Sequence, residues 1–103
     1  MNLIERNIDK IKYLCNHHFV KELYVFGSGL TSDFNKKSDV DLLIKFFHID
    51  PADYFDNYTE LKDELEKLLN RSVDIVEDQA IKNPIFRNSV DKSKKLLYER
   101  TSS

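Results

Sequence analysis

The chain contains few cysteine, glycine and proline residues, and it has no long apolar run. Its 103 residues include one cysteine, two glycines and two prolines. A single cysteine excludes any internal disulfide, and we expect the Cys15 thiol to be buried and inert. No apolar run approaches the ~18 residues of a membrane-spanning helix. The charged start MNLIERNIDKIK also lacks the apolar centre of a signal peptide. The sequence therefore predicts a cytosolic (cytoplasmic) protein with no membrane segment.

The chain also has no large excess of positive or of negative charge. Sixteen Lys and Arg against 18 Asp and Glu give a formal net charge of -2. Tight, non-specific binding to a phosphate backbone needs clustered cations, so we expect no strong nucleic-acid binding. The length suits a single domain over residues 1–103, with an ordered core over about 3–98. A hydrophobic fraction of 41% is typical of a globular domain with a modest core.

The periodicity of apolar residues predicts helices and strands in alternation. Asp50 before Pro51 and Asn83 before Pro84 are typical helix starts, and Asn70 ends the longer helix. The predicted elements are a helix over 3–19, strands over 22–27 and 39–46, a helix over 51–69, a strand over 72–77, a helix over 84–91 and an edge strand over 95–99. The short link between the first two strands favours antiparallel pairing. We therefore predict the α/β (or α+β) class, with one small mixed β-sheet and helices packed against it.

Each predicted helix has an apolar face that we expect to be buried. The residues on these faces are Ile4, Ile8, Ile11, Cys15 and Phe19 in the first helix, Tyr54, Phe55, Tyr58, Leu61, Leu65, Leu68 and Leu69 in the second, and Ile85, Phe86 and Val90 in the third.

Two carboxylates, Asp39 and Asp41, stand at the start of the second strand. Residues i and i+2 of a strand point to the same face, so their Cα atoms lie about 6.6 Å apart. Carboxylates this close repel each other, and a divalent cation such as Mg²⁺ removes the conflict. A third carboxylate completes a two-metal site, and Asp74 in the strand SVDIVE is the candidate.

Gly27 and Ser28 follow the first strand and suit a phosphate group. Glycine lets the backbone approach phosphate oxygens closely. The Ser28 hydroxyl and nearby backbone N–H groups are donors for the same oxygens. Gly-Ser alone and Asp-x-Asp alone are weak patterns, but together with a third acid in a short apolar strand they favour a phosphate-and-metal site.

Gly-Ser, ten residues and then Asp-Val-Asp resembles the signature of the nucleotidyltransferase superfamily that includes DNA polymerase β. The run FGS…SDVDLLIKF…VDIV is similar to its minimal nucleotidyltransferase (MNT) branch, over about residues 3–98. Members of that branch are frequently antitoxins paired with a HEPN-domain ribonuclease toxin. The resemblance implies a polymerase β-like nucleotidyltransferase fold, ATP as substrate and two Mg²⁺ ions as cofactor. It further implies transfer of AMP to a hydroxyl, a tyrosine of the toxin partner.

The resemblance also implies a role for each site residue. Gly27 and Ser28 would hold the triphosphate, Asp39 and Asp41 the metal ions, and Asp74 the metal and the attacking hydroxyl. The family commonly has an arginine three residues after the motif serine, where this chain has Thr31. The cations that could substitute for it are Lys36, Lys37 and Lys45.

Three alternatives compete with the nucleotidyltransferase. A binding module of the same fold would neutralise its partner by contact, and Thr31 favours it slightly. A phosphatase with an Asp-x-Asp nucleophile would have its apolar run before the acids, whereas LLIKF follows them. A template-directed polymerase would need a further domain to grip a duplex.

Overall fold

The computed structural model describes residues 3–26 and 39–100. Its elements, in chain order, are α1 (Leu3–Arg6), α2 (Ile8–His17), β1 (Val20–Phe26), β2 (Val40–Phe46), α3 (Pro51–Leu69), β3 (Val73–Glu77), the short 3-10 helix η2 (Asp78–Ala80), α4 (Pro84–Ser93) and β4 (Lys95–Glu99). Within these described residues, no helix combines the length and the apolar character needed to cross a membrane.

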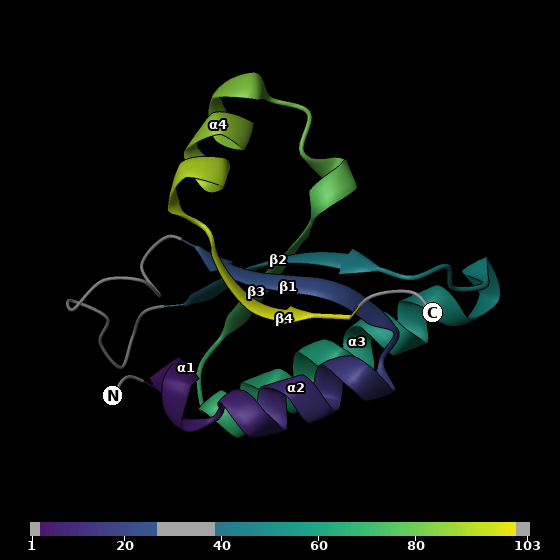
Figure 1. Cartoon of the computed structure of the whole chain (residues 1–103). Helices are drawn as coiled ribbons and strands as arrows, with labels where there is room; N and C mark the ends of the chain where they lie inside the picture. The colour runs from purple at the N-terminus through teal and green to yellow at the C-terminus, as the bar shows by residue number, and fades with distance from the viewer. Residues whose placement is uncertain (1–2, 27–38, 101–103) are drawn as a thin grey trace.

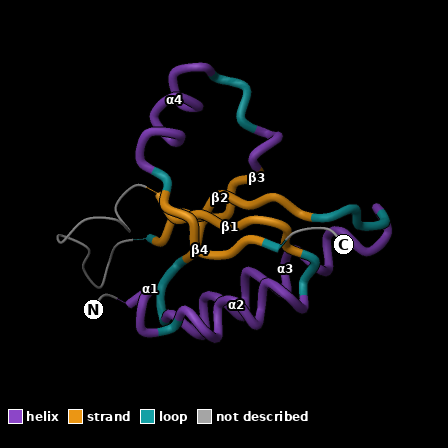
Figure 2. The backbone as a smooth tube through the Cα atoms, viewed as in Figure 1, coloured by secondary structure: helices purple, strands orange, loops and turns teal. Residues whose placement is uncertain are grey.

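The four strands form one mixed sheet in the order β3-β2-β1-β4. β1 pairs antiparallel with β2 and with β4, while β2 pairs parallel with β3. α1, α2 and α3 cover one face of the sheet, and α4 lies on the other (Figure 1, Figure 2). The predicted mixed sheet, the antiparallel first pair and the edge position of β4 are confirmed.

The core consists of two apolar clusters, one on each face of the sheet. The larger cluster joins the sheet to α1, α2 and α3, and its fully buried members include Ile11, Cys15, Val20, Leu23, Val40, Leu42, Ile44, Leu61, Leu65 and Leu69. The smaller cluster lies under α4 and consists of Phe26, Leu43 and Val90. Alternate residues of β2 enter the two clusters, because successive side chains of a strand point to opposite faces.

Helix ends follow the predicted signals. Asp50 accepts a hydrogen bond from the backbone N–H of Ala52 at 3.0 Å, and Asn83 accepts from Ile85 at 2.8 Å. Each of these caps satisfies a backbone donor that has no partner inside the helix. Asn70 ends α3 in the left-handed region, with φ 53°.

Side chains of α3 satisfy backbone groups of the edge strand β3. The Val73 N–H donates to the Glu66 carboxylate at 2.9 Å, and the Tyr58 hydroxyl donates to the Ile75 carbonyl at 3.0 Å. These bonds occupy groups that an edge strand would otherwise offer to another chain.

Some of the predicted burial and element bounds are wrong. The first helix divides at Asn7, whose side-chain amide donates to the Leu3 carbonyl at 2.9 Å. Phe19 lies outside the helix, exposed and with φ 61°, because the chain turns there into β1. Phe55 is exposed because it stands about 100° round α3 from Tyr54 and so misses the buried stripe. Ile85 and Phe86 are also exposed, and only Val90 of that predicted face is buried.

Cys15 should resist thiol reagents in the folded protein. The side chain is fully buried, and burial raises the pKa of the thiol to about 12. The thiolate is the nucleophile, so at pH 8 we expect labelling by an aromatic disulfide to be roughly 10³-fold slower in buffer than in denaturant. Equal rates in the two conditions, measured by absorbance of the released thiolate, would contradict this burial.

Candidate active site

Pairing between strands places two of the predicted acids side by side. In the parallel pair of β2 and β3, Asp41 is in register with Asp74. Neighbouring strands lie about 4.8 Å apart, so the two side chains start from adjacent backbone positions. Asp39 stands two residues before Asp41, immediately ahead of β2. The structure therefore brings all three predicted carboxylates to one end of the sheet.

The alternation of apolar residues explains why these acids share a face. Val40 and Leu42 enter the large cluster from β2, and Val73 and Ile75 enter it from β3. Asp41 and Asp74 therefore point to the α4 side. Asp74 and Asp39 are exposed, whereas Asp41 is half-buried.

Asp41 lies in an environment that opposes its negative charge. Burial raises its pKa, and the negative charges of Asp74 and Asp39 raise it further. Phe26, the last residue of β1, is the cross-strand partner of Asp41 and puts an aromatic ring next to it. The folded chain therefore opposes the ionised form of Asp41 unless a cation compensates for it.

The donor set suits Mg²⁺ bound together with a nucleotide. Mg²⁺ prefers oxygen ligands, and it commonly takes one or two carboxylates with substrate phosphate and water. Asp41 and Asp74 supply such carboxylates from adjacent backbone positions. Within residues 3–26 and 39–100, however, no three His, Cys, Asp or Glu side chains are grouped closely enough to hold a metal ion by themselves. Phosphate oxygens would have to supply the remaining ligands.

The predicted phosphate-binding residues lie outside the described part of the chain. These residues are Gly27 and Ser28, with Thr31, Lys36 and Lys37 in the same segment.

Lys45, one of the cations that could substitute for the family arginine, forms ion pairs away from the aspartates. It stands four residues beyond Asp41 on β2, which is about 13 Å away by strand rise. Its ammonium lies 3.7 Å from the Glu22 carboxylate and 3.9 Å from that of Asp78. These ion pairs assign Lys45 to the opposite end of the sheet from the aspartates.

The sequence reasoning missed the aromatic wall beside the acids. The rings of Phe26 and Phe86 meet edge to face, with centroids 6.2 Å apart, so the first turn of α4 reaches Asp41's cross-strand neighbour. The position of Phe26 directly before Gly27 was the available signal. No pattern in the sequence indicated that α4 would meet it.

A clamp around Arg87 fixes α4 against the sheet, and sequence reasoning missed this as well. The Arg87 guanidinium donates to the Asp78 carboxylate at 2.7 Å and to the Asp78 backbone carbonyl. A guanidinium that bonds two acceptors in this way is held in orientation as well as in distance. Asp91 links the same network to Lys94 at 3.3 Å.

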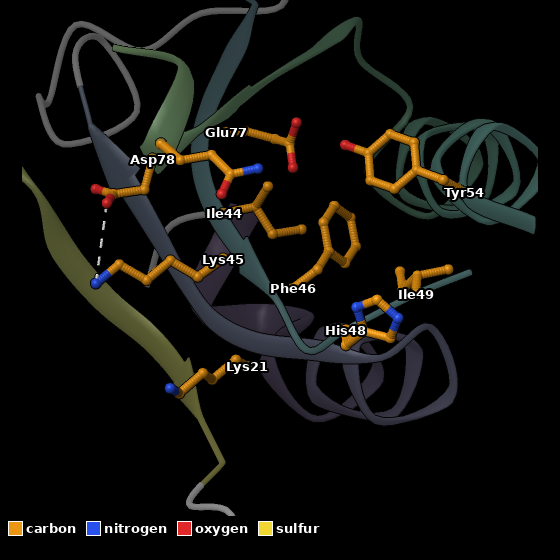
Figure 3. Close-up of a pocket in the computed structure, with 10 residues that line it drawn as sticks. Lys21, Ile44, Lys45, Phe46, His48, Ile49, Tyr54, Glu77 and Asp78 are labelled. Carbon is orange, nitrogen blue, oxygen red and sulfur yellow. Dashed lines mark ion pairs between the residues drawn. The ribbon is translucent and has the colours of Figure 1, made fainter. Parts of the chain in front are cut away.

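A cavity of about 450 Å³ lies at the other ends of β2 and β3 (Figure 3). Tyr54 points its hydroxyl toward Glu77 across this cavity, and Lys45 pairs with Asp78 at its side. Burial and the Glu77 carboxylate together raise the pKa of Tyr54. Phe46 and Glu77, the last residues of β2 and β3, line this cavity, whereas the three aspartates lie at or just before the beginning of these strands. This cavity is therefore separate from the carboxylate site.

Comparison with known families identifies the class of protein. Residues 9–103 match the family described as Polymerase beta, Nucleotidyltransferase. The chain belongs to this family and is a nucleotidyltransferase. Two Methanocaldococcus jannaschii proteins named as protein adenylyltransferases are similar to it. MJ0128 is 37% identical over 87 residues and MJ1379 is 33% identical over 89, each alignment covering 84% of both chains.

Solved structures agree with this class. A structure described as a minimal nucleotidyltransferase has a TM-score of 0.75 and 29% identity, and covers 92% of this chain and 95% of its own. A toxin–antitoxin structure with AMP-PNP has a TM-score of 0.70 and 23% identity, and the match covers 91% of this chain and 74% of the other. The structure of a tri-AMPylated Shewanella oneidensis HEPN toxin with an MNT antitoxin has a TM-score of 0.60 and 21% identity, and the match covers 93% of this chain and 72% of the other. The first confirms the predicted MNT resemblance, and the other two show the shared fold.

Replacing Asp41 with Asn should stabilise the protein when no ligand is present. Because the pKa of Asp41 is raised in the folded state, its contribution to stability is full below its unfolded pKa and is lost as pH rises through the folded pKa. At pH 7 we expect Asp41→Asn to raise Tm by about 2–4 °C, since Asp41 is partly exposed and screened.

The gain should disappear toward pH 3, where Asp41 is protonated in both states. Asp63→Asn, an exposed acid of α3, is the matched control. Thermal unfolding followed by circular dichroism at both pH values measures the effect. A lower Tm for Asp41→Asn at pH 7 would contradict the electrostatic description.

Proposed function

We propose that this nucleotidyltransferase is an Mg²⁺-dependent protein adenylyltransferase that acts as an antitoxin. It transfers AMP from ATP to a hydroxyl, a tyrosine side chain, of a HEPN-domain toxin in the cytoplasm. The observation that carries the proposal is the in-register pair of Asp41 and Asp74, together with the raised pKa of Asp41. Two relatives named as adenylyltransferases and a related fold found with an AMPylated HEPN toxin support the choice of reaction and partner.

We assign the nucleotide side of the site to Asp39, Asp41, Gly27 and Ser28. Asp39 and Asp41 would hold Mg²⁺, two ions in all when Asp74 contributes, and Gly27 and Ser28 would hold the triphosphate. Bound Mg²⁺ would neutralise charge on the phosphate oxygens and on the carboxylates.

Asp74 is the residue that acts on the acceptor hydroxyl. The tyrosine oxygen attacks the α-phosphorus of ATP, a new P–O bond forms, and the bond to the bridging oxygen of the β-phosphate breaks. Pyrophosphate leaves in line with the attacking oxygen. The Asp74 carboxylate takes the proton of the hydroxyl, because an acceptor near neutral pH needs a base within reach. Its exposed position on β3 leaves it accessible to an acceptor from solvent.

A second candidate function is a binding module that neutralises the partner by contact alone. Two observations favour it. Thr31 stands where the family has an arginine, and the described residues offer no three-acid group that holds a metal unaided. The modification state of the partner distinguishes the two candidates.

Mg²⁺ and ATP together should stabilise the folded protein more than either alone. A ligand that binds only the folded state raises stability by about 2.7 kcal/mol at a hundred times its Kd. We expect a rise in Tm of about 10 °C or more with both ligands in excess, since about 1 kcal/mol shifts Tm by roughly 4–8 °C in a domain of this size. The Asp39→Asn, Asp41→Asn double variant should lose this response. An equal rise in the Tm of the double variant would show that Asp39 and Asp41 do not bind the metal ion.

Asp74→Asn should separate binding from transfer. The amide keeps the size of the side chain and cannot accept the hydroxyl proton. We expect the variant to bind Mg²⁺-ATP and the HEPN toxin normally, while AMP transfer falls by about 10²- to 10⁴-fold. Intact mass of the toxin measures transfer, and its ribonuclease activity measures neutralisation. Full neutralisation by Asp74→Asn with no added AMP mass would favour the binding module over the enzyme.

A further inference from the structure

We infer that the exposed first turn of α4, around Ile85 and Phe86, is the surface on which the acceptor protein docks its modified segment. This inference rests on the proposed adenylyl transfer and adds the surface that holds the acceptor. A transfer enzyme must hold the acceptor chain beside its acids, because reaction requires the hydroxyl within about 3–3.5 Å of the phosphorus.

The orientation of α4 is the first observation. A surface helix normally turns its apolar stripe inward and its charges outward. In α4 the side chains of Arg87 and Asp91 take part in ion pairs, Arg87 with Asp78 and Asp91 with Lys94, the residue that follows the helix. Ile85 meanwhile is 81% exposed and Phe86 is 41% exposed. The helix therefore presents its apolar first turn to solvent.

The side chains that follow Ile85 by one turn on the same face carry no charge, and the exposed Lys92 stands a further turn along. Asn88 and Ser89 stand three and four residues after Ile85, on the same side of the helix, and both are exposed. Apolar residues bordered by uncharged polar groups are typical of a surface that a protein partner covers. An apolar acceptor segment would meet uncharged side chains over this first turn and the one that follows it.

The position of this turn relative to the acids is the second observation. Six large apolar side chains are exposed within residues 3–26 and 39–100: Tyr13, Phe19, Phe55, Ile85, Phe86 and Leu96. Phe86 packs on Phe26, and Phe26 is the cross-strand partner of Asp41. The first turn of α4 is thus continuous with the carboxylate site. Tyr13, in contrast, belongs to α2 on the opposite face of the sheet (Figure 1).

The clamp described above gives this surface a fixed position. Arg87 follows Phe86 directly and is bonded twice to Asp78 at the end of β3. Asn83 caps the same turn through the N–H groups of Ile85 and Phe86. A turn held at both ends loses little freedom on binding, which favours its use as an anchor.

The test compares Ile85→Ser with Tyr13→Ser. Ile85 is exposed enough for its replacement to leave the fold intact, and Tyr13, 62% exposed, is the matched control on the other face. The probe is a HEPN-domain protein, the acceptor proposed above, with AMP transfer followed by intact mass. We expect Ile85→Ser to raise KM for this acceptor at least about tenfold, with kcat and the Tm response to Mg²⁺-ATP unchanged. Tyr13→Ser should change none of the three.

Binding measured alongside transfer keeps the two proposals distinct. If wild type transfers AMP and Ile85→Ser has an unchanged KM, or if Tyr13→Ser loses as much, the docking surface is overturned while the enzyme stands. If the wild type transfers no AMP but Ile85→Ser still weakens acceptor binding about tenfold by calorimetry, the docking surface is supported and the adenylyl-transfer proposal is contradicted. If wild type neither binds nor modifies the acceptor, both are overturned.

Discussion

Repulsion between two aspartates is the constraint on which the functional description depends. Parallel pairing of β2 with β3 fixes Asp41 beside Asp74, and neither strand can shift without exposing its buried residues. A register one residue different would turn Val40 and Leu42 out of the core. The apolar pattern that folds the sheet therefore also holds the carboxylates together, so that they repel until a cation compensates.

The rest of the fold supports this arrangement from both faces. The large cluster anchors β2 and β3 from below through α3, and Glu66 and Tyr58 bond directly to the backbone of β3. On the other face, α4 packs Val90 against Phe26 and Leu43 and brings an aromatic wall to the acids. The ion pairs of Arg87 connect this wall to the end of β3. One face thus supplies stability, and the other supplies the surroundings of the site.

Local patterns predicted the strands, the helix starts and the three acids, because each depends on nearby residues. Val73 and Ile75 alternate with Asp74 in the sequence as they do in the sheet. The patterns did not predict that Ile85 and Phe86 would face solvent, since the period of a helix identifies an apolar face without saying which side the protein covers. The ion pairs of Lys45 were also missed, because Glu22 and Asp78 reach it only through sheet pairing and the turn after β3. The roles of all five site residues remain predictions from sequence, and for Gly27 and Ser28 so does their position.

The central claim is that the AMP moiety of ATP becomes covalently attached to a partner protein. The most direct measurement incubates this chain, Mg²⁺ and the HEPN-domain acceptor with ATP labelled at either the α- or the γ-phosphorus, followed by denaturing electrophoresis. We expect label from the α-phosphorus to stay on the acceptor, while label from the γ-phosphorus leaves as pyrophosphate. Label from the γ-phosphorus on the acceptor would indicate phosphorylation. A neutralised acceptor that carries neither label would show that this nucleotidyltransferase acts by contact alone.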